Sequence, residues 1–292
     1  MTYVFPIRVG LSIVGTILFF ISILGVRAET STLPDPSKSI VQVQVWSLNV
    51  DFLAEPVQRG SGVFVELPTN SGKRPFIITN AHVVTLPKDI RETRVESEPI
   101  IFVCSPRVGE RIPRCHTAAA IVSIDHDQDL ALLALFNPLN GVSLGMDSGI
   151  SAIDLTSGTQ PTVGDTIRFF GYPSTGAESL TLTQGIVSGF LDRGATSLIK
   201  SDAQLNPGNS GGGAFDAVGN FIGLANAIVK GPGGALGLAI PADRVAQWTA
   251  SLGSIDLDSV RIGALPRGIT IAFQDAESLF PEIGFSATQY AL

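Results

Sequence analysis

Charged residues are scarce in this sequence, and the few that are present do not form a basic cluster. Of 292 residues only 15% are Asp, Glu, Lys or Arg, and the formal net charge is −7. A surface that binds nucleic acid needs grouped Lys and Arg, so we expect no nucleic acid partner. Hydrophobic residues make up 45% of the chain, which excludes disorder as its main state.

Cysteine is almost absent, and the two that occur lie close together. Cys104 and Cys115 are in "FVCSPRVGERIPRCHTA", where two apolar stretches flank a loop rich in Pro, Gly and Arg. A disulfide between them would stabilise the fold by about 2–4 kcal/mol in an oxidising compartment. Two free thiols are the simpler alternative. A zinc site of Cys104, Cys115 and His116 is a third, but it has no fourth ligand nearby.

Helical periodicity is also rare. With 31 Gly and 18 Pro, the chain divides from Ile40 onward into short runs rich in Val, Ile, Phe and Thr, which predicts an all-β sandwich or barrel. The segment "FNPLNG" at 136–141 interrupts these runs, and it predicts a seam between β lobes at about 40–137 and 141–240. One helix is predicted after Pro241, in "ADRVAQWTASLG", with Gly253 as its stop.

Only one long apolar run lacks charge altogether, from Val9 to Val26. It predicts either a signal peptide cleaved after Ala28 or a retained membrane anchor, and in both cases an exported protein. The location would be periplasmic, secreted or anchored to the outer face of the cytoplasmic membrane. The expected organisation is residues 1–28 as signal or anchor, 29–39 as linker, 40–252 as one domain and 253–292 as a C-terminal extension without a recognisable motif.

The sequence holds only three histidines. His116 follows a cysteine in a predicted hairpin and His126 lies in the polar loop "DHDQD", so both are most simply solvated. His82 directly follows an apolar strand in "FIITNAHVV", where it is either a buried structural histidine or a catalytic base. Asp129 abuts the apolar run "LALLAL" and is the carboxylate closest to a buried strand. A carboxylate there needs a hydrogen-bond partner, and an imidazole N–H would be one. The alternative is an aspartate that only caps the edge of the strand.

A third polar segment, "DAQLNPGNSGGGAF" at 202–215, places one serine among glycines. A tight surface turn would account for this composition. A serine nucleophile would account for it too, because the backbone N–H groups of Gly208 and Ser210 could then bind the oxyanion of an attacked carbonyl. A serine hydroxyl needs a nearby base, and that base needs a partner that holds its tautomer.

Taken together, "TNAHVV", "DLALL" and "NPGNSGG" resemble the three catalytic segments of trypsin-like serine proteases, particularly the bacterial Deg/HtrA branch. The segments "QRGSGVFVE" at 58–66, "FIGLANAIV" and "GALGLAIP" are similar to neighbouring strands of that family. The resemblance covers roughly residues 40–250. It implies two six-stranded antiparallel β-barrels with the catalytic residues in the cleft between them.

The resemblance also assigns roles. Ser210 would be the nucleophile, His82 the general acid and base, and Asp129 its orienting carboxylate, with Gly208 and Ser210 forming the oxyanion hole. The substrates would be proteins or peptides, cleaved through an acyl-enzyme without metal or organic cofactor. The residues flanking the primary specificity pocket would be Gln204, Leu205, Ala225, Asn226 and Ala227. Because Gln204 is not acidic, we expect a small or medium apolar side chain in that pocket.

Three departures from the family qualify this reading. Gly213 stands where a proline is common, which alters the following turn. About 40 residues follow the predicted helix, too few for the PDZ domain of the Deg/HtrA branch, so a stand-alone protease is expected. The chain has no "IVGG"-like start of the kind that activates digestive zymogens. The alternatives are a catalytically silent or latent binding protein on a protease fold, and an esterase that uses the same three residues.

Overall fold

A computed structural model describes residues 35–48, 54–93, 99–107, 109–136, 150–175, 179–193, 196–231 and 234–260. The predicted signal or anchor at 1–28, most of the predicted linker and the seam at 137–141 lie outside these residues, as does the C-terminal extension beyond 260. Within the described residues, no helix is both long and apolar enough to cross a membrane.

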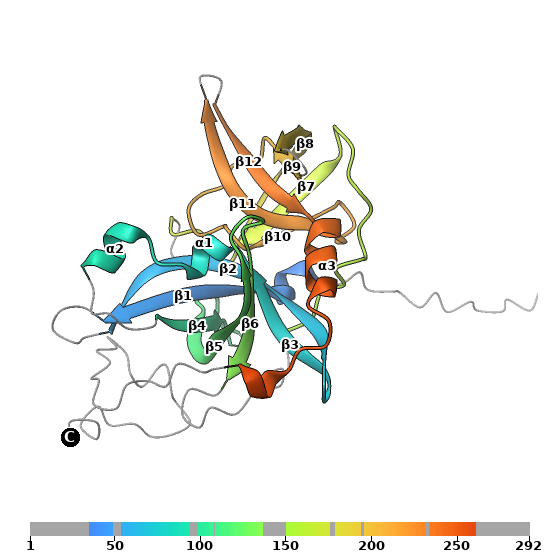
Figure 1. The fold of residues 1–292 in the computed structure, drawn as a ribbon. Coiled ribbons are helices and arrows are strands. Elements are labelled where there is room, and N and C mark those ends of the chain that lie inside the picture. Colours follow the sequence, from blue (N-terminus) through green and yellow to red (C-terminus); the bar gives the residue numbers. More distant parts are fainter. Residues whose placement is uncertain are drawn as a thin grey trace, which may run out of the picture. The chain divides into compact units, whose positions relative to one another are not determined.

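Six strands form the first closed antiparallel barrel, in the order β1-β2-β3-β6-β5-β4 (Figure 1). A 3-10 turn, η1 (Pro36–Ser39), precedes them, and two short helices, α1 and α2, follow the third strand. The elements are β1 (Ile40–Leu48), β2 (Ala54–Thr69), β3 (Gly72–Thr79), α1 (Ala81–Val84), α2 (Lys88–Glu92), β4 (Ile100–Ser105), β5 (Arg114–Asp125) and β6 (Leu130–Phe136).

A second closed barrel has the order β10-β11-β12-β9-β8-β7, which confirms the all-β class and the two-barrel architecture that the resemblance implied. The predicted helix follows it as α3 (Figure 1). The elements are β7 (Thr166–Gly171), β8 (Thr181–Arg193), β9 (Thr196–Ser201), β10 (Gly213–Phe215), β11 (Phe221–Gly231), β12 (Gly234–Pro241), α3 (Ala242–Ser251) and the 3-10 turn η2 (Leu257–Ser259).

Alternation along the strands explains the barrel interiors. In β1 the side chains of Val41, Val43 and Val45 are fully buried and pack inside the first barrel. In β7 the side chains of Ile167 and Phe169 do the same inside the second barrel. Successive side chains of a strand point to opposite faces, so each of these strands contributes every second residue to its interior.

A third apolar cluster joins the two barrels. It combines outward-facing residues of β2, β3 and β6, such as Val63 and Phe76, with residues of the second barrel and of α3, such as Phe215 and Trp248. Strand β6 contributes to both sides, since Leu133 packs inside the first barrel and Leu132 packs in the joining cluster. This is why every residue of "LALLALF" is buried.

The two cysteines form a disulfide, as predicted. Cys104 in β4 and Cys115 in β5 are paired across the hairpin, with their Cα atoms 3.9 Å apart. Because both thiols are consumed in this bond, the alternatives of two free thiols and of a zinc site with His116 are wrong.

Candidate active site

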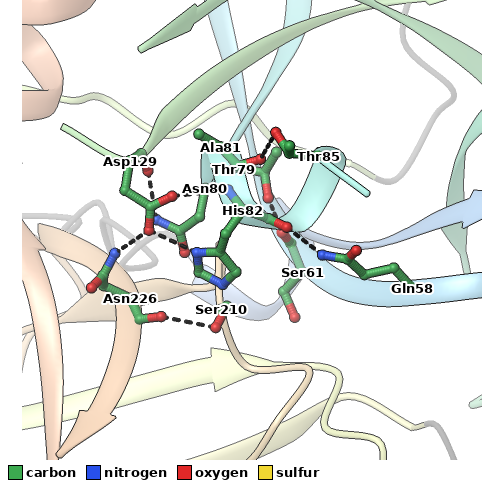
Figure 2. A network of polar contacts seen from close by, with 10 residues as sticks. All are labelled: Gln58, Ser61, Thr79, Asn80, Ala81, His82, Thr85, Asp129, Ser210 and Asn226. Carbon is green, nitrogen blue, oxygen red and sulfur yellow. Dashed lines mark hydrogen bonds and ion pairs between the residues drawn. The ribbon is translucent and has the colours of Figure 1, made fainter. Parts of the chain in front are cut away.

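His82 lies in α1, the single helical turn that directly follows β3. Its backbone N–H donates to Oδ1 of Asp129 at 2.9 Å, and its ring Nδ1 is 2.7 Å from Oδ2 of the same carboxylate (Figure 2). An ionised carboxylate can only accept hydrogen bonds, so Nδ1 carries the ring proton and Nε2 keeps a free lone pair. The imidazole side chain is 48% exposed, which leaves Nε2 open to a reacting group.

Asp129 ends the turn between β5 and β6, and its backbone is in the left-handed region with φ 56°. This conformation is uncommon for a residue other than glycine, although aspartate tolerates it better than most. Two groups compensate for it. The Asn80 side-chain amide donates to the Asp129 carbonyl at 3.0 Å, and the Asn226 side-chain amide donates to Oδ2 at 2.6 Å. The carboxylate itself is fixed by His82 of α1 and by Asn226 of β11.

Asn226 connects the carboxylate to the serine. The register of β11 against β12 shifts between Ala225 and Ala227, and this bulge re-aims the side chain between them. The Asn226 amide meets Asp129, while its backbone carbonyl accepts the Ser210 hydroxyl at 2.9 Å (Figure 2). The sequence predicts that Asn226 flanks the specificity pocket, and the structure adds these two contacts; its role in the pocket stays a prediction.

Ser210 lies in the loop between β9 and β10, and Figure 2 shows its side chain on the Nε2 side of the His82 ring. At rest the hydroxyl donates to Asn226, and the described contacts include no hydrogen bond from it to His82. In free enzymes hydrogen bonds between catalytic groups are often long and shorten only when substrate binds.

Gly208 has φ +97°, and a Cβ placed on it would lie 2.5 Å from the Tyr172 carbonyl oxygen and 2.8 Å from the Ser174 nitrogen. Only glycine satisfies both constraints. Among the described residues, the backbone N–H groups of Gly208 and Ser210 have no internal acceptor. Two backbone N–H groups without an internal acceptor in one loop are available to donate to a ligand oxygen.

The remaining predicted specificity residues surround this loop. Leu205 and Ala225 are buried, Ala227 is partly buried and Gln204 is exposed. The Ala225 backbone pairs with the serine loop, accepting from the Gly211 N–H at 2.8 Å and donating to the Gly212 carbonyl at 2.7 Å. Their part in substrate selection stays a prediction.

A second acidic residue stabilises the turn that carries Asp129. Partial burial disfavours the charge of Asp125, but the backbone N–H and side-chain amide of Gln128 donate to this carboxylate and hold its pKa below its usual value. Arg244 of α3 then donates to the Gln128 side-chain oxygen at 3.1 Å. Among the described residues, no group of three or more His, Cys, Asp and Glu side chains is placed to hold a metal ion.

Two closed six-stranded barrels joined by one apolar cluster, with His, Asp and Ser side chains gathered from both, define the fold class of trypsin-like peptidases. The model of the trypsin-like peptidase domain family matches residues 60–224, and the chain belongs to this family.

The chain is also similar to characterised proteases. It is 31% identical over 234 residues to "Protease Do-like 1, chloroplastic" of Arabidopsis thaliana, covering 76% of this chain and 44% of that protein. It is 29% identical over 213 residues to "Periplasmic serine endoprotease DegP" of Escherichia coli, covering 70% of this chain and 38% of the relative. The chain therefore spans less than half the length of these relatives.

Proposed function

We propose that this protein is a serine endopeptidase in which Ser210 is the nucleophile, His82 the general base and Asp129 the carboxylate that orients the imidazole. The observation that carries the proposal is the contact of 2.7 Å between His82 Nδ1 and Asp129 Oδ2. It fixes the tautomer in which Nε2 can accept a proton, on the side of the ring where Ser210 lies.

The reaction follows from these positions. Ser210 Oγ attacks the carbonyl carbon of the scissile peptide bond while its proton moves to His82 Nε2. The carbonyl oxygen becomes an oxyanion that accepts from the N–H groups of Gly208 and Ser210, each donor contributing about 3–4 kcal/mol to transition-state stabilisation. The imidazolium then protonates the leaving amine, and water, deprotonated by the same imidazole, hydrolyses the acyl-enzyme.

The expected substrates are proteins or peptides with a small or medium apolar side chain before the cleaved bond, selected around Gln204, Leu205, Ala225, Asn226 and Ala227. We further propose an exported or compartmentalised protease. Two observations support this location: the disulfide between Cys104 and Cys115, and the words "periplasmic" and "chloroplastic" in the names of relatives.

Reaction with a fluorophosphonate probe tests the proposal directly. The full chain is expected to be labelled at Ser210 and to cleave casein, and Ser210→Ala should abolish both. Ser188→Ala, which removes an exposed hydroxyl from β8, is the matched control and should keep both. A folded chain that ignores the probe and every peptide of a library would instead support a silent or latent binding protein.

A further inference from the structure

The backbone from Pro207 to Ser210 carries the two N–H groups without a described acceptor, and each of its other N–H and carbonyl groups has a partner. The Asn209 N–H donates to the Asn206 carbonyl at 3.0 Å, and the Asn209 carbonyl accepts from Gly212 at 2.9 Å. The Ser210 carbonyl accepts from the Ser61 N–H at 2.8 Å. In a trans peptide the C=O and N–H point in opposite directions, so fixing a carbonyl also fixes where the next N–H points.

Ser61 of β2 is fully buried and belongs to the first barrel, yet its hydroxyl forms hydrogen bonds with residues of the second barrel. It donates to the Gly208 carbonyl at 2.7 Å and accepts from the Tyr172 N–H at 2.8 Å. Its own carbonyl accepts from the buried Thr79 hydroxyl at 2.7 Å (Figure 2). One side chain therefore joins β2, the segment after β7 and the nucleophile loop.

Ser174, which follows β7, fixes the peptide group between Pro207 and Gly208. Its backbone N–H and its hydroxyl both donate to the Pro207 carbonyl, each at 2.9 Å. This carbonyl and the Gly208 N–H belong to the same peptide group. With the carbonyl bound to Ser174, the Gly208 N–H points the other way, toward the oxyanion position.

The backbone alone would not impose this orientation. Gly208 has φ +97°, and because glycine also adopts negative φ, the Pro207–Gly208 peptide could rotate and turn its carbonyl toward the reacting oxygen. A carbonyl there would repel an oxyanion. Two described contacts oppose this rotation. Ser174 binds the Pro207 carbonyl on one side of Gly208, and Ser61 binds the Gly208 carbonyl on the other side.

We propose that Ser61 and Ser174 are positioning residues of the oxyanion hole, which hold the Gly208 N–H in its donating orientation before substrate binds. This inference rests on the proposed peptidase function. Neither hydroxyl touches the substrate. Ser174 acts through the Pro207 carbonyl, which shares a peptide group with the Gly208 N–H, and Ser61 acts through the Gly208 carbonyl, which fixes the other side of the same flexible glycine. Their loss should therefore slow the chemical step and leave substrate binding and the imidazole unchanged.

Ser174 offers the milder test, because it is exposed and its backbone N–H still holds Pro207 after substitution. Ser174→Ala is expected to lower kcat about three- to tenfold, the effect of one neutral hydrogen bond, with KM unchanged. Ser174→Thr keeps the hydroxyl and should restore most of the rate. Thr175→Ala, an exposed neighbour with no described side-chain hydrogen bond, is the matched control and should leave kcat unchanged.

Ser61→Ala removes the central contact and is expected to lower kcat about tenfold to a hundredfold, less than the hundred- to thousandfold loss of a whole oxyanion donor. Fluorophosphonate labelling should slow in parallel. The pH at which activity is half-maximal and the rate of His82 modification by diethyl pyrocarbonate should stay as in the wild type. Ser47→Ala, a buried serine whose hydroxyl has no partner among the described residues, controls for loss of a buried hydroxyl.

A crystal structure of Ser61→Ala completes the test without relying on activity. We expect the Gly208–Asn209 peptide, which loses its donor to the Gly208 carbonyl, to be reoriented in part or all of the molecules and the Gly208 N–H to turn away from its wild-type direction. A folded Ser61→Ala variant with wild-type kcat, or an unchanged peptide orientation, overturns the inference. A shifted pH profile or slower His82 modification also overturns it, because the loss would then come from the triad. Absence of labelling in the wild type would refute the peptidase proposal, and the crystal structure would still decide the orientation.

Discussion

Asn226 shows how much a single side chain contributes to this site. Its amide donates to the same oxygen of Asp129 that faces the imidazole. With Asn226→Ala that oxygen loses a donor, so the carboxylate is held less firmly in the position that orients the imidazole. We expect kcat/KM to fall about tenfold, as for the loss of one hydrogen bond to a charged group.

The matched control for this substitution is Asn220→Ala. The Asn220 amide also donates to an aspartate, Asp216, at 2.8 Å, but in a turn outside the His82–Asp129 contact network. It should leave kcat/KM unchanged. A kcat/KM of Asn226→Ala equal to that of the wild type would show that this amide does not help to position the carboxylate.

At the residue scale, the sequence predicts those residues that can be recognised from their immediate neighbours in the chain. His82, Asp129 and Ser210 can be predicted as catalytic residues from the sequence because each lies in a distinctive run of neighbours, and their roles stay a prediction. The contacts of Asn226 with Asp129, 97 positions apart, and of Ser61 with Gly208, 147 positions apart, follow only from the closed barrels. Ser61 was present in the quoted segment "QRGSGVFVE", but nothing in that string indicates which backbone its hydroxyl meets.

At the scale of elements, the turn between β5 and β6 is stabilised by a carboxylate that favours its charged form. The pKa of Asp125 is held low, so its contribution to stability is present above the pKa of the unfolded chain and is lost as pH falls through the folded value. Asp125→Asn should therefore destabilise the protein at pH 7. The difference from the wild type should shrink as pH falls through the acid range.

Urea unfolding of both proteins from pH 7 to pH 3 measures this difference. Asp127→Asn, an exposed carboxylate in the same turn, removes the same charge without the Gln128 contacts and serves as the control. A constant difference between Asp125→Asn and the wild type across this range would mean that the carboxylate's charge does not stabilise the turn.

Element boundaries were partly predictable. The helix after Pro241 was expected from the spacing of Val245 and Trp248, and it begins and ends within the quoted segment. Strand β6 was recognisable as an apolar run, but its burial on two sides was not. A continuous apolar run is compatible with any fully buried element, and only the packing of two barrels explains why Leu132 and Leu133 are both fully buried.

At the scale of the whole molecule, the chain returns to the first barrel after crossing the second. Beyond α3, the Ile255 N–H donates to the Pro68 carbonyl at 3.1 Å and its carbonyl accepts from the Asn70 N–H at 3.3 Å. The Ile255 side chain is buried in the cluster that joins the barrels. The predicted extension therefore begins with residues that bind the β2–β3 hairpin, which no local sequence pattern indicated.

This return predicts that the two barrels unfold together. Ile255→Ala should lower the free energy of unfolding by about 2–4 kcal/mol, because it removes buried methyl groups from a shared cluster, while kcat stays unchanged in the folded protein. Val218→Ala, at a side chain that is 51% exposed, should change stability little. Trp46 of the first barrel and Trp248 of the joining cluster allow each region to be followed by fluorescence in single-tryptophan variants. Coincident transitions are expected in both variants, and two separate midpoints would mean that the cluster does not couple the barrels.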